Sequence, residues 1–262
     1  MSLPSDLTSS LRARGAAVAR VSVPQERVLL RAYRLARRFF ERTSAANKQR
    51  CQFLSADAAL GPAPVLIGYR HLQGTKELVR VLGKLPSQLP AALRRAIKEA
   101  QRVLDDLLMQ GLIALLRNGG HHTSQRSLRR LCRGACPLDL FYYPNQPHCT
   151  EPTSPHVDRG YLHAIVASPS AGLELYEDGE WAAPHMIWPT LQPHADVIIL
   201  ANDALARLSR EPGWQGGVID ACLHRVVNST PHTARLSVSY ELRPAFGRAL
   251  DASEPRSGVP SH

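Results

Sequence analysis

The sequence has few cysteines and no long run of apolar residues. Its 262 residues include five cysteines, a low and odd number that does not resemble the disulfide framework of a small secreted domain. No stretch approaches the roughly 20 apolar residues that a membrane-spanning helix needs. We therefore expect a protein of a reducing compartment, the cytoplasm, with no membrane association. Hydrophobic residues make up 44% and charged residues 21%, a balance typical of a globular protein with a sizeable core.

Acidic residues are scarce in the first half of the chain. Residues 1–133 hold 24 Lys and Arg against 8 Asp and Glu, whereas residues 134–262 hold 8 against 14. This asymmetry indicates two structurally different halves. A nucleic-acid-binding surface would explain the basic half, but arginine-rich helices with solvated faces are the simpler explanation. The first fifty residues, rich in Arg and Ser, also resemble an organelle transit peptide, so organelle targeting stays open.

Apolar residues in the first half recur with a helical period. Over residues 28–40 they form one broad stripe with arginines elsewhere, which predicts an amphipathic helix. A second, longer helix is predicted from Pro90 to the sequence Asn118-Gly119-Gly120, which is a suitable C-terminal cap. At about 1.5 Å per residue this helix would be roughly 40 Å long, enough to brace a whole domain. Residues 61–68, which contain Gly and Pro, are expected to form a loop.

The pattern changes to short β-prone runs in the second half. These runs occupy residues 138–143, 161–167, 173–176, 197–200, 218–227 and 235–242. The dipeptide Asp178-Gly179 predicts a tight hairpin turn after the third run. Many short strands separated by turn residues are typical of a β-sandwich or a jelly-roll barrel. We expect a helical region over residues 1–133, a β domain over residues 134–244 and a flexible tail over residues 245–262.

The sequence His156-Val157-Asp158 is the sharpest local feature. Residues two apart in a strand project from the same face, so this imidazole and this carboxylate are expected to point into one space. A second histidine, His224, lies in a later β-prone run. Two histidines and one carboxylate form the facial triad of non-haem Fe(II) oxygenases, which leaves the other coordination positions open. We predict a metal site at His156, Asp158 and His224.

Arg235 and Ser237 are again two residues apart in a β-prone run and therefore share a face. An arginine presents a planar fork that binds a carboxylate bidentately, and the serine hydroxyl lies beside it. Because this run follows His224 closely in the sequence, an antiparallel neighbour would place Arg235 near the metal. A dicarboxylate could then chelate the metal at one end and bind Arg235 and Ser237 at the other.

The second half resembles the isopenicillin N synthase-like group of 2-oxoglutarate- and Fe(II)-dependent oxygenases. The family pattern is His-x-Asp, a distant His and then Arg-x-Ser, which residues 156–158, 224 and 235–237 match. The sequence Leu140-Phe141-Tyr142-Tyr143-Pro144 is similar to the family's Asn-Tyr-Tyr-Pro strand, which implies that Tyr143 contacts 2-oxoglutarate. Residues 138–244 match nearly in order and residues 11–80 match faintly. The faint match counts against a transit peptide, since those residues would belong to the fold.

The resemblance implies an α+β fold in which N-terminal helices pack around a double-stranded β-helix (jelly-roll) core. It implies an oxygenase that uses Fe(II), 2-oxoglutarate and O2 to hydroxylate or desaturate a substrate, with release of succinate and CO2. We expect a monomer that acts on a small molecule. The sequence does not indicate which one, because substrate contacts in this fold come from loops and N-terminal helices, where the resemblance is thinnest.

Other functions stay open at this point. The same fold could act on a protein or a nucleic acid, could be a non-catalytic scaffold, or could be an iron oxidase that uses no 2-oxoglutarate. The intact ligand pattern speaks against a scaffold, and nucleic acid is the less favoured substrate. Cys132, Cys136, His148 and Cys149 could hold zinc by residue type, but their spacing matches no common zinc pattern.

Overall fold

The computed structural model describes residues 6–72, 74–83, 85–144, 149–228 and 233–250. Its elements follow one another along the chain in this order: α1 (Leu7–Arg14), β1 (Ala16–Arg20), α2 (Val23–Arg42), α3 (Ala45–Gln49), β2 (Gln52–Ser55), a 3-10 turn (Ala58–Leu60), β3 (Val65–Leu72), β4 (Lys76–Val81), α4 (Ala91–Asn118), α5 (Gln125–Leu131), β5 (Leu138–Tyr143), β6 (Thr153–His156), β7 (Leu162–Val166), β8 (Leu173–Glu177), β9 (Glu180–Ala182), α6 (Pro184–Ile187), β10 (Asp196–Ala201), α7 (Asp203–Leu208), β11 (His224–Val226) and β12 (Arg235–Leu242).

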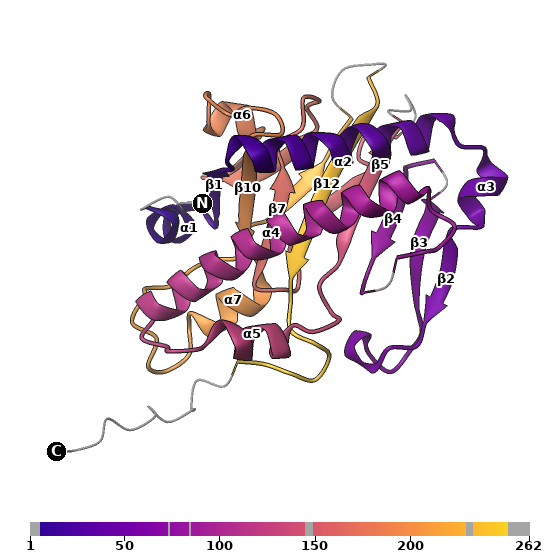
Figure 1. Ribbon diagram of the computed structural model, residues 1–262. Helices are drawn as coiled ribbons and strands as arrows, with labels where there is room; N and C mark the ends of the chain where they lie inside the picture. The colour runs from indigo at the N-terminus through magenta and orange to yellow at the C-terminus, as the bar shows by residue number, and fades with distance from the viewer. Residues whose placement is uncertain (1–5, 73, 84, 145–148, 229–232, 251–262) are drawn as a thin grey trace.

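The strands form two antiparallel sheets. The larger has eight strands in the order β1-β10-β7-β12-β5-β4-β3-β2, and the smaller has four in the order β6-β11-β8-β9. Side chains from both sheets line one cavity between them. This is the predicted double-stranded β-helix core, and its class is α+β as expected. Figure 1 shows α2 and α4 lying across one face of the larger sheet.

Helices α2 and α4 cover the sheet with their apolar stripes. Helix α2 begins after Ser22, whose backbone N–H and hydroxyl both donate to the Gln25 side chain, and it buries residues such as Phe39 and Phe40 while Arg31 stays exposed. Helix α4 runs from the residue after Pro90 to Asn118, as the periodicity predicts. Among the described residues, no helix combines the length and the apolar character needed to cross a bilayer.

Strand β12 separates the helical layer from the cavity. Its even-numbered residues, such as Val238, belong to the core that α2 and α4 share with the sheet, and the Tyr240 hydroxyl donates to Asp105 of α4 at 2.8 Å. Its odd-numbered residues, such as Ser237 and Glu241, line the cavity on the other face. The period of two along a strand produces this division. The helices therefore lie on the face of the sheet that is turned away from the cavity.

The hairpin between β8 and β9 confirms the predicted turn. Tyr176 pairs with Trp181, and the two residues between Glu177 and Glu180 are Asp178 and Gly179. Both have positive φ, 51° and 89°, as a two-residue turn of the primed type requires.

The region before residue 134 is less purely helical than the sequence indicates. Four strands, β1 to β4, come from it and join the same sheet as β5, β7, β10 and β12. Residues 65–72, part of which was expected to be a loop, form β3, which pairs with β2 and β4. Gly68 sits inside β3 because its Cα approaches the Cys51 carbonyl so closely that a Cβ would lie 1.8 Å from that oxygen. In the predicted strand 218–227, only β11 is regular.

We expect the substitution Leu108→Ala to lower the free energy of unfolding by about 2–5 kcal/mol, because it opens a cavity in a fully buried position of α4. Urea unfolding of the full chain measures this change. Leu54→Ala, at a side chain that is 68% exposed, is the matched control and is expected to change the value by less than about 0.5 kcal/mol. Equal effects of the two substitutions would contradict the assignment of α4 to the core.

Candidate functional site

The three predicted metal ligands lie together at one end of the smaller sheet. His156 ends β6 and His224 begins β11, and the two residues are paired across these strands. Their ring centroids are 4.3 Å apart. With Asp158 they place one nitrogen or oxygen ligand atom each within 4.8 Å of one another. The structure therefore brings together residues that lie far apart in the sequence.

Asp158 reaches this cluster in a different way from the one predicted. Strand β6 ends at His156, so Asp158 lies in the loop that follows and not on a shared strand face. Backbone hydrogen bonds hold this loop against the start of α7, since the Asp203 amide donates to the Asp158 carbonyl at 3.0 Å. The Ala204 amide likewise donates to the Gly160 carbonyl at 3.0 Å. The position of the carboxylate therefore depends on contacts with a segment that is distant in the sequence.

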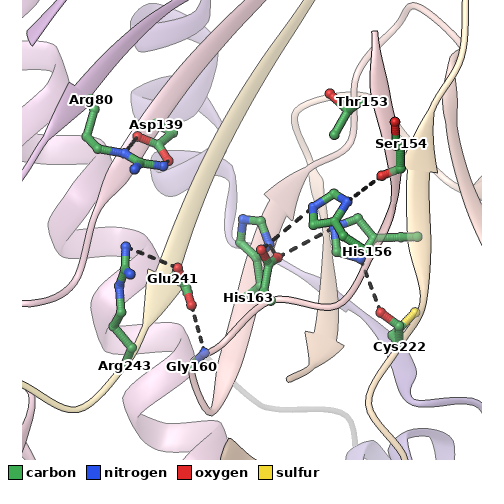
Figure 2. Close-up of polar contacts among 12 residues, drawn as sticks. Arg80, Asp139, Thr153, Ser154, His156, Gly160, His163, Cys222, Glu241 and Arg243 are labelled. Atoms are coloured by element: carbon green, nitrogen blue, oxygen red, sulfur yellow. Dashed lines mark hydrogen bonds and ion pairs between the residues drawn. The ribbon is translucent and has the colours of Figure 1, made fainter. Parts of the chain in front are cut away.

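Hydrogen bonds to the backbone set the orientation of both imidazoles. His156 Nδ1 donates to the Ser154 carbonyl at 2.8 Å, and His224 Nδ1 donates to the Cys222 carbonyl at 3.1 Å (Figure 2). A nitrogen that donates carries the proton, so each ring has its Nε2 lone pair free. His156 Nε2 lies 3.8 Å and His224 Nε2 lies 3.5 Å from Asp158 oxygens. Two Nε2 atoms and a carboxylate are the donor set that suits non-haem Fe(II).

The electrostatics of the cluster favour metal binding. Burial disfavours the charged form of Asp158, but His163, His224 and His156 outweigh it and hold the pKa of this carboxyl well below its usual range. Burial lowers the pKa of His224 to about 4, although Asp158 opposes the change. At neutral pH the carboxylate is therefore ionised and His224 is neutral, which are the protonation states in which these groups bind metals.

His163 is a residue of the site that sequence reasoning missed. It lies on β7, and its Nδ1 is 2.5 Å from Asp158 Oδ2. Burial lowers its pKa, but Asp158 together with Glu241 and Asp139 raises it, and the net direction is upward. The two residues are five positions apart, but one lies in a loop and the other on a strand, so no regular period in the sequence indicates that they face each other.

Arg235, Ser237 and Tyr143 lie together on two neighbouring strands of the larger sheet. Arg235 of β12 is paired with Tyr143 of β5, and Ser237 follows two positions along on the same face. Lys76 of β4 is a further cation here, since its Nζ lies 5.7 Å from the Tyr143 ring centroid and donates to Thr153 at 2.5 Å. The prediction that Arg235 and Ser237 share a face is therefore correct.

Arg235 is a buried cation. No acidic side chain of the described residues forms a salt bridge with it. It is 6% exposed, and burial lowers the pKa of its guanidinium. Its Nη1 donates to the carbonyls of Ser170 and Ala171, whereas its Nε has no hydrogen-bond partner among the described residues. Burying an uncompensated charge is costly. The chemistry of this position thus fits the carboxylate of a bound dicarboxylate.

One cavity of about 280 Å³ contains all six predicted residues. Its wall also includes charged side chains that are unusual for the inner face of a sheet: Arg80, whose Nε and Nη2 donate to Asp139 at 2.8 and 2.7 Å, and Glu241 (Figure 2). A neighbouring hollow of about 310 Å³ also reaches Arg235 but includes none of the three candidate metal ligands.

The zinc alternative finds no support among the described residues. Within that part of the chain, the His, Cys, Asp and Glu side chains that lie close enough together to hold an ion are His156, Asp158 and His224, and no cysteine is among them. Cys132 and Cys136 line a separate hollow beside α4 and α5. His148 lies outside the described residues.

Solved structures share this architecture. The chain is similar to a full-length Neurospora crassa protein solved in complex with α-ketoglutarate, at 17% identity and a TM-score of 0.66, covering 91% of this chain and 77% of that one. It is also similar to AtDAO1, a dioxygenase for auxin oxidation from Arabidopsis thaliana, at 16% identity and a TM-score of 0.71, covering 96% and 94%. At such identities the likeness shows the fold. No curated protein sequence matches the chain.

A family model completes the comparison. The model of the 2OG-Fe(II) oxygenase superfamily matches residues 135–244, the part of the chain that carries every one of the six predicted site residues. A matching family model, a matching fold and a His-Asp-His cluster in one cavity with a buried arginine agree with one another. Residues 135–244 of the chain therefore match the 2OG-Fe(II) oxygenase superfamily, on a fold that solved 2-oxoglutarate-binding proteins share.

Proposed function

We propose that the chain is a non-haem dioxygenase that depends on Fe(II) and 2-oxoglutarate, in which His156, Asp158 and His224 hold the Fe(II) and Arg235, Ser237 and Tyr143 bind the 2-oxoglutarate. The single observation that carries this assignment is the shared cavity. Its wall contains two imidazoles with free Nε2 atoms, the ionised carboxylate of Asp158 and a buried arginine, Arg235, that forms no salt bridge with an acidic side chain of the described residues. No other group of described residues combines a metal-binding donor set with a carboxylate-binding cation.

Different residues of the chain would hold the metal ion and 2-oxoglutarate. The carbonyls of Ser154 and Cys222 keep each imidazole turned so that Nε2 faces the metal position. Arg235 supplies the charge that draws the distal carboxylate of 2-oxoglutarate, and the hydroxyl of Ser237 lies on the same face. When bound, iron and 2-oxoglutarate supply the oxidising chemistry, in which O2 is consumed, succinate and CO2 are released, and the substrate is hydroxylated or desaturated.

A small polar molecule is the substrate class that we propose. The cavity of about 280 Å³ is small, and Arg80, Asp139 and Glu241 give part of its wall a charged, hydrogen-bonding character. Neighbouring folds were solved with small molecules of this kind, namely thymine and 5-formyluracil in the Neurospora crassa protein. Hydrogen-bonding groups placed in a pocket select ligands that can pair with them, because an unpaired buried polar group is costly.

The basic helices of the first half of the chain give no support for a nucleic-acid substrate. Its cationic helices α2 and α4 pack on the face of the larger sheet that is turned away from the cavity, as Figure 1 and the division of β12 show. A polyanion bound to these helices would lie behind the sheet and not at the metal position. The arginines of α2 that are exposed, such as Arg31 and Arg34, fit the simpler explanation of a solvated helix face.

Anaerobic addition of Fe(II) and 2-oxoglutarate to the metal-free full chain is expected to produce a weak visible metal-to-ligand charge-transfer band. His156→Ala and Arg235→Ala are expected to abolish it, the first by removing a ligand and the second by removing the carboxylate partner. His71→Ala and Arg31→Ala, at exposed positions, are the matched controls and should keep the band.

The band separates the competing functions. Fe(II) binding without the band would favour an iron oxidase that uses no 2-oxoglutarate. A folded wild-type chain that binds neither iron nor 2-oxoglutarate would contradict the site assignment and favour a scaffold.

We expect Tyr143→Phe to raise the Kd for 2-oxoglutarate about two- to tenfold while the Kd for Fe(II) stays unchanged, because one hydrogen bond contributes about 0.5–1.5 kcal/mol. Titration of the charge-transfer band with 2-oxoglutarate measures this. Tyr176→Phe, at an exposed tyrosine of β8, is the matched control. If Tyr143→Phe behaves like the wild type, the hydroxyl serves only its contact with Thr153.

A further inference from the structure

The carboxylate of Asp158 has no strand to orient it. It lies two residues beyond the end of β6, and its side chain is 21% exposed. A loop side chain has several rotamers, and a metal ligand must be held in one of them if the binding site is to exist before the metal arrives. Groups outside the loop must therefore select the orientation of this carboxylate.

His163 contacts the carboxylate directly. Its Nδ1 donates to Asp158 Oδ2 at 2.5 Å, and its side chain is 12% exposed. This hydrogen bond occupies Oδ2 and leaves Oδ1, which lies 3.8 Å from His156 Nε2, free of hydrogen bonds from the described residues. His163 comes from β7 of the larger sheet, whereas the two imidazoles belong to the smaller sheet, so the carboxylate is held by a residue of the other sheet. Figure 2 shows the side chains of His163 and His156 turned toward each other.

Glu241 holds the backbone of the same loop. It is paired with His163 across β12 and β7, and its Oε1 accepts a hydrogen bond from the Gly160 amide at 2.7 Å. Its Oε2 forms an ion pair with Arg243 at 3.3 Å. Gly160 permits this approach because a Cβ there would lie 2.9 Å from Glu241 Oε1 and 2.6 Å from the Leu242 carbonyl.

We propose that His163 and Glu241 form a clamp that positions Asp158 for metal binding: His163 holds the side chain and Glu241 holds the backbone two residues later. This inference rests on the proposed role of Asp158 as a metal ligand. His163 acts through Asp158 and is a positioning residue, since among the described residues it does not belong to the set of ligand atoms that surround one point. Neither the His-x-Asp nor the Arg-x-Ser sequence pattern includes His163 or Glu241, so these patterns do not predict the clamp.

Metal affinity of the full chain tests the clamp without any substrate. We expect His163→Leu to weaken the binding of Fe(II) and of Co(II) about 10- to 100-fold, the usual effect of removing the partner of a metal ligand. His163→Asn is expected to restore affinity to within about threefold of wild type, because the asparagine Nδ2 lies where the ring Nδ1 lies and can donate to Oδ2. The visible spectrum of bound Co(II) reports whether the coordination geometry is kept.

A second pair of variants tests the backbone half of the clamp. Glu241→Gln keeps an oxygen that accepts from the Gly160 amide and should bind metal like the wild type. Glu241→Leu removes that acceptor and should weaken binding about three- to tenfold, the equivalent of one lost hydrogen bond. His71→Leu, at an exposed histidine, is the matched control for the histidine series.

The outcomes distinguish the clamp from the site itself. If the folded wild type binds neither metal, the proposed site is wrong. If the wild type binds and His163→Leu binds equally well, the clamp is overturned. If His163→Asn loses binding as completely as His156→Ala, His163 is a ligand, which also overturns the clamp. Should His163→Leu fail to fold, His163→Gln replaces it, because its longer side chain carries the N–H beyond the Nδ1 position and should weaken binding similarly.

Discussion

Strand β12 must satisfy two environments at once, and the rest of the structure depends on this constraint. Its even-numbered residues pack into the core under α2 and α4, while its odd-numbered residues bring Arg235, Ser237 and Glu241 to the cavity. A shift of one residue in its pairing would bury the charges in the helical core and turn the apolar side chains toward the cavity. The register with β5 and β7 is therefore strongly determined, and it places Arg235 beside Tyr143 and Glu241 beside His163.

The candidate site contains buried charged groups that lower the stability of the folded protein and that folding alone would not favour. Arg235 is buried without an acidic partner among the described residues, and Asp158 keeps its charge in a partly buried loop among three imidazoles. Uncompensated polar groups destabilise a folded protein, and such exceptions to good packing concentrate at functional sites. A bound metal ion and a dicarboxylate would balance both, which is the physical link between this arrangement and the function proposed for it.

The sequence predicts the elements whose determinants are local. The apolar period of α4, the Asp178-Gly179 turn and the alternation of β12 are all visible within short windows, and the structure confirms them. The first half of strand β3 was expected to be a loop, because Gly and Pro mark turns whereas its pairing with β2 and β4 is a long-range property. Only β11 is regular within the predicted strand 218–227, since its partners β6 and β8 are themselves short.

The sequence by itself determined the residue types of the proposed site and their order: His156 and Asp158, then His224, then Arg235 and Ser237. Residue chemistry and the two-residue period are enough for that, because both can be read along the chain. Only the tertiary structure decided that Asp158 reaches the metal position from a loop, and that His163, Glu241 and Lys76 surround the site. The contacts of Glu241 with Gly160 and of Lys76 with Tyr143 join segments that are distant in sequence, whereas the contact of His163 with Asp158 spans five residues and depends on the path of the loop between β6 and β7. Local sequence patterns specify neither the pairing of distant strands nor the path of such a loop.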